Sequence, residues 1–279
     1  MPDLKFPFCV LDVDGTLTFA YDDFHPAIAE PVQQYRRLGG VVALLSGRLP
    51  DGMLRAVQWL GLSGGTLLGG GDGAVGARLL EDGSLEWLWQ NALETAILLP
   101  GLLQAAEPGV ALTPNRVIAV GNINKVMDRM AAITAPEILH IAGWDRLPDA
   151  LAGEPLCGLR FILERERTQH LIEILSEIPE GDREIFDNAE FTSRHVGYSI
   201  RPAGSDKGSA LARLMEIAGY TPAQTAAFGD WITDIPMLRR AGFSCAPADA
   251  LKPVQEAASR VSAHTIRDGW LARELALLW

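Results

Sequence analysis

The chain has 279 residues, of which 48% are hydrophobic, and its formal net charge at pH 7 is -11. This length and apolar content allow a substantial core, in one large domain or two ordinary ones. The negative charge repels nucleic-acid phosphates, so no nucleic-acid partner is expected. No apolar run approaches the roughly 18 residues of a membrane-spanning helix, and a membrane partner is not expected either.

The three cysteines, Cys9, Cys157 and Cys245, stand in apolar surroundings. Their spacing fits neither a zinc site nor a disulfide framework, so we predict small core residues in a reducing compartment. No cationic segment followed by an apolar stretch opens the chain, and a cytoplasmic location is therefore expected. The sequence gives no indication of an oligomeric state.

The first predicted strand, Phe8 to Leu11, runs directly into Asp12-Val13-Asp14-Gly15. Two carboxylates so close together at the end of a buried strand repel each other unless a cation or a proton offsets them. The pattern therefore indicates a bound divalent cation, and we expect Mg²⁺. An ordinary strand-to-turn connection is the alternative. A calcium loop is excluded because the glycine falls at the fourth position and not at the sixth.

A second strand, Val41 to Leu45, is apolar throughout and runs into Ser46-Gly47-Arg48. A third short strand follows at residues 66–68, and predicted helices precede and follow the second strand. This alternation is typical of a doubly wound, Rossmann-like α/β domain with a parallel sheet. The Gly-rich stretch 69–73 lacks the context of a phosphate loop, so a turn or hinge is predicted there.

The pattern of predicted strands and helices changes at about residue 83, and the earlier pattern returns at about residue 194. Strands of a different, mixed sheet are predicted at 85–89, 116–120 and 158–163, with helices between them. We therefore predict an inserted α+β domain at 83–194 within a core formed by 1–82 and 195–279. The core pattern resumes with a strand at 196–200 and a helix that begins at Lys207 and ends near Gly219.

The polar residues that follow the core strands form a chemically consistent set. They are Asp12 and Asp14, Ser46, Lys207, and Asp230 with Asp234. Because the carboxyl ends of parallel strands meet at one edge of a doubly wound sheet, we expect these residues to converge. An aspartate can attack phosphorus, Mg²⁺ can bridge carboxylate and phosphate oxygens, and a lysine with a hydroxyl group can hold the remaining charge.

On these motifs the chain resembles the haloacid dehalogenase superfamily of phosphotransferases, in its Cof-type, sugar-phosphatase-like branch. The matching segments are Leu11 to Leu17, Leu45 to Arg48, Asp206 to Leu211, and Gly229 through Asp234 to Leu238. The resemblance spans essentially the whole chain, and its motifs stand in the family's order. It implies that 83–194 is a cap domain that covers the active site and selects the substrate.

The resemblance also implies a role for each matching residue. Asp12 would be the nucleophile that forms an aspartyl-phosphate, and Asp14 the general acid and base. The implied Mg²⁺ ligands are Asp12, the carbonyl group of Asp14, and Asp230, while Asp234 would orient a metal-bound water or Lys207.

The remaining implied roles concern the phosphate group. Ser46 would donate a hydrogen bond to it, Lys207 would neutralise its charge, and Gly47 and Arg48 are assigned to phosphate or substrate binding with them. Thr233 stands where this branch commonly has Asn, so a direct contact to metal or phosphate is weakened or replaced by water there.

The expected activity is Mg²⁺-dependent hydrolysis of a small phosphorylated metabolite, such as a sugar phosphate. A phosphomutase is the nearest alternative, because it shares the aspartyl-phosphate. A phospho-accepting signalling domain differs in the order of its motifs and lacks the insertion, and a binding protein without turnover does not need Asp12, Asp14 and Lys207. Arg160, Arg165, Arg167 and His195 are candidate substrate contacts of the cap.

Overall fold

The computed structural model describes residues 4–19, 22–105, 108–176, 183–190 and 195–279. The chain divides into two compact units, Met1–Leu88 with Asp206–Trp279, and Trp89–Ser205. The predicted insertion, 83–194, overlaps most of the second unit, and its last four residues lie outside the described part of the chain. Its role as a cap stays a prediction.

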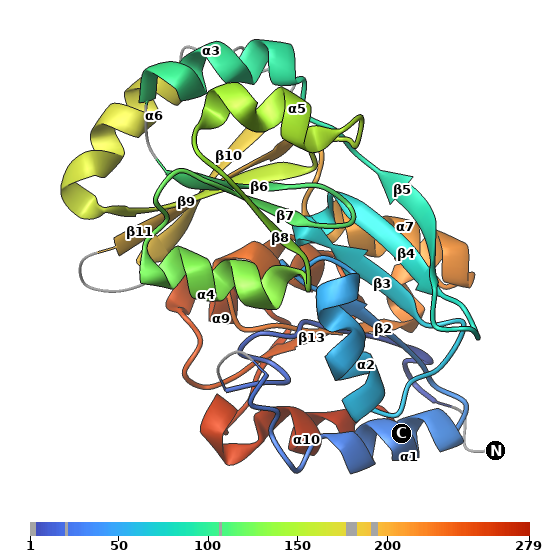
Figure 1. Ribbon diagram of the computed structural model, residues 1–279. Helices are drawn as coiled ribbons and strands as arrows, with labels where there is room; N and C mark the ends of the chain where they lie inside the picture. The colour runs from blue at the N-terminus through green and yellow to red at the C-terminus, as the bar shows by residue number, and fades with distance from the viewer. Residues whose placement is uncertain (1–3, 20–21, 106–107, 177–182, 191–194) are drawn as a thin grey trace. The chain divides into compact units, whose positions relative to one another are not determined.

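The first unit contains the predicted doubly wound sheet, which is confirmed. The sheet has eight strands in the order β14-β13-β12-β1-β2-β3-β4-β5. Figure 1 labels β2, β3 and β4 as neighbouring strands of it. The strands from β14 to β3 pair in parallel, and β4 pairs antiparallel with β3. Their bounds are β1 Phe8–Leu11, β2 Val41–Leu45, β3 Leu67–Gly70, β4 Val75–Leu79, β5 Leu85–Gln90, β12 Thr225–Phe228, β13 Phe243–Ala246 and β14 Arg260–Val261.

Helices pack on both faces of this sheet, as the apolar strands require. The longer ones are α1 Ala29–Arg37, α2 Leu54–Trp59, α7 Lys207–Ala218, α8 Ile235–Arg240, α9 Lys252–Ala257 and α10 Trp270–Leu275. Short 3₁₀ turns lie at Asp51–Met53, Gly71–Gly73, Pro222–Gln224, Ile232–Asp234 and Ile266–Asp268.

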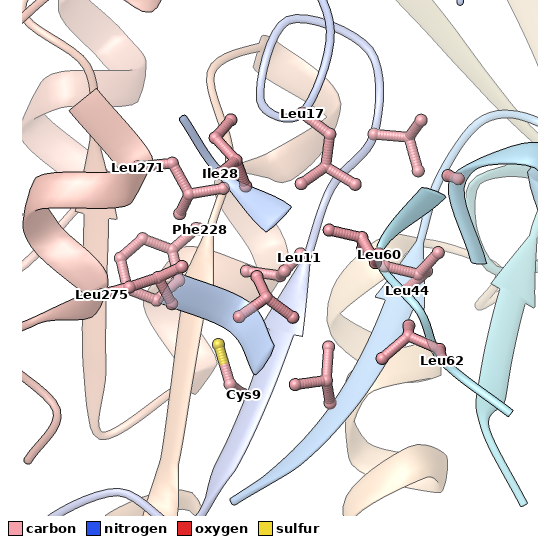
Figure 2. Packing of buried hydrophobic residues seen from close by; sticks show 14 of the residues in the cluster. Cys9, Leu11, Leu17, Ile28, Leu44, Leu60, Leu62, Phe228, Leu271 and Leu275 are labelled. Atoms are coloured by element: carbon pink, nitrogen blue, oxygen red, sulfur yellow. The ribbon is translucent and has the colours of Figure 1, made fainter. Parts of the chain in front are cut away.

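Successive strand residues point to opposite faces and so divide the core in two. Cys9, Leu11 and Phe228 pack in a cluster with side chains of α1, α2 and α10. Figure 2 labels Phe228 and Leu275 among the buried side chains of this cluster. Ala227, one residue before Phe228, belongs to a different cluster with side chains of α8 and α9. Apolar residues thus cover the sheet on both faces, and the strand ends remain for the polar residues.

The second unit is built around a mixed sheet of six strands in the order β10-β11-β9-β6-β7-β8. All neighbours pair antiparallel except β7 and β8. The strands are β6 Gly109–Leu112, β7 Val117–Val120, β8 Ile138–Ile141, β9 Gly158–Glu164, β10 Arg183–Glu190 and β11 His195–Pro202. The helices are α3 Thr95–Ala105, α4 Lys125–Thr134, α5 Leu147–Leu151 and α6 Thr168–Ser176, with 3₁₀ turns at Trp144–Arg146 and Arg165–Arg167.

Two of the predicted strands lie in a different sheet from the one in which they were expected. The strand at 85–89, expected in the mixed sheet, is β5 and extends the first sheet beside β4. The strand at 196–200, expected in the core sheet, is β11, which pairs antiparallel with β10 and β9. Both strands pair with the strand that precedes them in the chain, and composition alone does not reveal such neighbour pairing. None of the helices in the described segments has the length and apolar run needed to cross a bilayer.

Candidate active site

Three neighbouring strands of the first sheet deliver the predicted site residues to one edge. In the order β12-β1-β2, the strands end at Phe228, Leu11 and Leu45. Asp12, Ser46 and Asp230 follow within two residues of these ends, and all three are buried. The backbone N–H of Asp12 donates to the carbonyl oxygen of Phe228 at 3.0 Å, which continues the ladder one residue beyond the strand.

Helix α7 brings Lys207 to the same place. Asp206 caps the helix: its carboxylate accepts from the Ser209 backbone N–H at 2.6 Å, and its own N–H donates to Ser209 Oγ at 3.0 Å. Lys207 is the first helical residue and is 2% exposed. Its Nζ donates to Asp12 Oδ1 at 2.6 Å and to Asp234 Oδ1 at 2.5 Å. The ammonium group therefore links a residue at the end of β1 to one in the turn before α8.

Asp234 uses its other carboxylate oxygen to shape the loop after β12. Asp234 Oδ2 accepts from the backbone N–H groups of Asp230 and Trp231 at 2.9 and 2.8 Å. One oxygen thus holds the loop and the other holds Lys207. Asp234 thus contacts both Lys207 and the loop after β12, and the orienting role expected for it stays a prediction.

One carboxylate oxygen from each of Asp12, Asp230 and Asp234 lies within 4.8 Å of the others, close enough for a metal ion to be held among them. Asp230 also accepts from Thr16 Oγ1 at 2.9 Å. Lys207 brings one positive charge to these three buried acids. A divalent cation would supply the charge that this set of hard oxygen ligands calls for.

The protonation of the cluster reflects its burial. Burial raises the pKa of Asp12 to about 8, with Lys207 acting in the opposite direction and the charge of Asp234 adding to the rise. Burial and the charge of Asp12 hold the pKa of Asp230 well above its usual range. Burial alone would lower the pKa of Lys207, but the charges of Asp12 and Asp234 outweigh it and raise that pKa. Lys207 is therefore a permanent cation in this site.

Glycine is required at position 15 by both conformation and space. Gly15 has φ +85°, and a Cβ built on it would lie 2.1 Å from Asp230 Oδ2. The backbone of the Asp12–Thr16 segment thus passes directly against the Asp230 carboxylate.

Ser46 and the Gly-rich stretch meet at the same edge. Ser46 Oγ accepts from the Arg48 backbone N–H at 3.2 Å, and the Ser46 carbonyl accepts from the Asp72 N–H at 3.1 Å. Asp72 is buried in a left-handed conformation with φ 55° within the turn Gly71–Gly73, so the turn predicted for this stretch is confirmed. Its charge is one of those that raise the pKa of Lys207.

Asp14 points to a different partner from Asp12. Arg48 holds it with two hydrogen bonds, from Nε to Oδ2 at 2.9 Å and from Nη2 to Oδ1 at 2.6 Å. Nη1 of the same guanidinium donates to Asp22 Oδ1 at 2.6 Å, and Arg55 Nη1 donates to Asp22 Oδ2 at 2.6 Å. The Arg48 side chain is 2% exposed, against 38% for Asp14 and 20% for Asp22.

The structure thus brings Asp12, Lys207, Asp230 and Asp234 into contact or into one cluster, with Ser46 at the end of the adjoining strand. Gly47 follows Ser46 half-buried, and Thr233 lies half-buried in the turn before α8. The candidate cap contacts Arg160, Arg165, Arg167 and His195 are all in the second unit. Sequence reasoning missed Thr16, Asp22 and Asp72, although Thr16 stands inside the first motif.

These polar residues lie outside the carboxyl ends of the strands, which is where open α/β sheets bind their ligands. A family model described as haloacid dehalogenase-like hydrolase matches residues 149–272. A haloacid dehalogenase-like hydrolase from Bacteroides thetaiotaomicron has the same fold, with a TM-score of 0.81 and 20% identity over 99% of this chain and 100% of that one. The chain is therefore similar to the haloacid dehalogenase-like hydrolases, in sequence over residues 149–272 and in fold over nearly its whole length.

Two curated relatives are phosphatases. The chain is 26% identical to phosphoglycolate phosphatase of Methanosarcina acetivorans, over 95% of this chain and 94% of that one. It is 29% identical over 111 residues to 5-amino-6-(5-phospho-D-ribitylamino)uracil phosphatase YcsE of Bacillus subtilis, which is 40% of this chain and 43% of that one. The matches to YcsE and to a chloroplast endoribonuclease of Arabidopsis thaliana span less than half the length of those relatives.

Proposed function

We propose that the protein is a phosphatase that hydrolyses a small phosphomonoester, with Mg²⁺ and through an aspartyl-phosphate on Asp12. The match of residues 149–272 to the hydrolase family model and the similarity to phosphoglycolate phosphatase support the reaction class. The observation that carries the assignment of residues is the ion pair of buried Lys207 with Asp12 and Asp234, beside Asp230. Such a cluster holds a nucleophilic carboxylate next to a fixed cation, as attack on a phosphate dianion requires.

The metal ligands we propose are the Asp12 and Asp230 carboxylates together with the carbonyl oxygen of Asp14. Asp234 is a poor candidate ligand because Lys207 and two backbone N–H groups already occupy its oxygens. The raised pKa values of Asp12 and Asp230 support the proposal, since two buried acids that resist ionisation gain most from a nearby cation. Bound Mg²⁺ would neutralise charge on the phosphoryl oxygens.

The chain's own residues supply the rest of the proposed reaction. The Asp12 carboxylate attacks phosphorus, and the ester bond to the leaving oxygen breaks. Asp14 donates a proton to that oxygen, so the alcohol leaves neutral, and then takes a proton from the water that hydrolyses the aspartyl-phosphate. The partial exposure of Asp14, at 38% of its side chain, suits a group that must meet both substrate and water.

A sugar phosphate or a related phosphorylated metabolite is the substrate class we propose. A sugar phosphatase of subclass IIB, BT4131, shares the fold with a TM-score of 0.75 and 16% identity over 97% of this chain and 98% of that one. We further propose that residues 83–194 act as a cap that selects the substrate, and that the protein works in the cytoplasm.

The test is phosphate release from a panel of sugar phosphates, phosphoglycerates and an aryl phosphate, with Mg²⁺ or with a chelator. We expect release that depends on Mg²⁺ in the wild type and is abolished in the nearly isosteric Asp12→Asn variant. Hydrolysis by that variant at the wild-type rate would contradict the assignment of Asp12 as the nucleophile. Interconversion of sugar phosphates without release of phosphate would instead identify a mutase.

A further inference from the structure

Arg48 was expected to bind phosphate, but its contacts indicate another task. We propose that Arg48, anchored by Asp22, is a positioning residue that orients the Asp14 carboxyl group for proton transfer to the leaving oxygen. The inference rests on the proposed function, because it presumes that Asp14 acts as the acid.

The first argument is where the guanidinium nitrogens point. Nε and Nη2 donate to Asp14, and Nη1 donates to Asp22 and, at 3.3 Å, to the carbonyl oxygen of Gly52. Every nitrogen of the group already has a protein oxygen as acceptor. At least four of the five N–H groups thus donate to protein oxygens, and three of them point at the Asp14 and Asp22 carboxylates.

The second argument is the geometry of the contact with Asp14. The final torsion of an aspartate side chain has a broad energy profile, so a half-exposed carboxyl group rotates readily. A planar guanidinium that donates to both oxygens fixes the plane of the carboxylate as well as its distance.

The third argument is the support behind Arg48. A cation whose side chain is 2% exposed needs counter-charges, and Asp14 and Asp22 supply them. Asp22 lies outside the first motif, and it also pairs with Arg55, whose side chain is 73% exposed. Asp22 thus holds the far side of Arg48 while Asp14 remains accessible.

The step served by this arrangement conserves atoms and charge. As the ester P–O bond breaks, a bond forms between the Asp12 carboxylate and phosphorus, and the proton of Asp14 moves to the leaving oxygen. The products are the free alcohol, the aspartyl-phosphate and the Asp14 carboxylate. Arg48 keeps its charge and its protons throughout.

Leaving groups of different basicity distinguish orientation of the acid from binding of phosphate. The two probes are p-nitrophenyl phosphate, whose leaving group needs little protonation, and phenyl phosphate, whose leaving group needs more. The value of kcat/KM reflects only the steps up to and including release of the phenol. Hydrolysis of the aspartyl-phosphate, which follows, does not affect it. For Arg48→Met we expect a loss with phenyl phosphate that exceeds the loss with p-nitrophenyl phosphate by about tenfold or more. Equal losses would mean that Arg48 binds phosphate, and would overturn the inference.

A double-variant comparison tests whether Arg48 acts through Asp14. Adding Arg48→Met to Asp14→Asn should cost little further kcat/KM with p-nitrophenyl phosphate, because the group to be oriented is already disabled. Losses that multiply would contradict the proposal. Arg48→Lys keeps the charge but loses the bidentate contact, so we expect its kcat/KM to stay close to that of Arg48→Met. A kcat/KM near the wild-type value would show that charge alone suffices and would contradict the proposal.

Two further variants serve as controls for misfolding. Asp22→Asn keeps the size of the anchor and should show the same preference for p-nitrophenyl phosphate with a smaller loss. Arg55→Ala removes only the exposed outer pair and should leave both kcat/KM values within about twofold. Absence of turnover in the wild type would overturn the proposed function together with this inference, while turnover with equal losses would overturn the inference alone.

Discussion

Gly15 is the position where one added methyl group would reach the carboxylate cluster. Ala at a positive φ costs about 1–2 kcal/mol of stability, and at Gly15 the Cβ would also lie 2.1 Å from Asp230 Oδ2. Gly83 has the same φ of +85° with nothing within 4 Å of its Cβ, so it offers a matched control.

We therefore expect Gly15→Ala and Gly83→Ala to lose similar stability from backbone strain, but only Gly15→Ala to lose activity. The loss should be about 10–100-fold at limiting Mg²⁺, since Asp230 must move. Urea unfolding and Mg²⁺ titrations of phosphate release measure the two effects separately. Equal activity in the two variants would show that Asp230 need not stay where the structure places it.

At the residue scale, position after a parallel strand was enough to predict that Asp12 and Asp230 lie together. Lys207 was expected there as well, although the strand that precedes it belongs to the other sheet. Asp12 and Lys207 are 195 positions apart in the chain, yet the end of β1 and the N-terminus of α7 bring them together. The pairing of Arg48 with Asp14 and Asp22 could not be predicted in this way. It depends on the direction of a long side chain, and strand ends alone do not determine that.

At the scale of single elements, α7 holds Lys207 in place through its N-terminal cap. Asp206→Ala removes the capping carboxylate and should lower the free energy of unfolding by about 1 kcal/mol. Asp206→Asn keeps an acceptor of the same size and should stay close to wild type. Chemical unfolding of the three proteins checks this, and a loss in Asp206→Asn as large as in Asp206→Ala would argue against the cap.

Many of the elements were predictable, but β4, β6, β8 and β10 were not, and neither were the pairing partners of two predicted strands. The helix predicted from Lys207 to about Gly219 is α7, Lys207–Ala218, because its cap and its C-terminal glycine are local signals. The strands β5 and β11 were also found, yet in the wrong sheets. An apolar run indicates a strand and leaves open which neighbour it pairs with.

At the scale of the whole molecule, the buried acids connect stability to pH and metal. The pKa of Asp12 rises from 3.8 to about 8 in the folded state. Between about pH 4 and pH 8, the metal-free folded protein keeps a proton on Asp12 that the unfolded chain has already released. The free energy of unfolding therefore falls as the pH rises through this window. Mg²⁺ binds the ionised carboxylates and offsets that loss.

The increase in melting temperature caused by Mg²⁺ should therefore be larger at about pH 8 than at about pH 6. Thermal unfolding with Mg²⁺ and with a chelator at both pH values gives this difference directly. In Asp12→Asn the dependence on pH should shrink. A stabilisation that is the same at both pH values would contradict the proposed link between the carboxylate cluster and the metal.

The central claim is that Asp12 carries the phosphoryl group during turnover. The most direct measurement is rapid acid quenching of the enzyme during hydrolysis, followed by mass spectrometry of the peptide that contains Asp12. The account predicts one phosphoryl group on Asp12 in the wild type and none in Asp12→Asn. A phosphoryl group on a different residue, or turnover at the wild-type rate by Asp12→Asn, would contradict it.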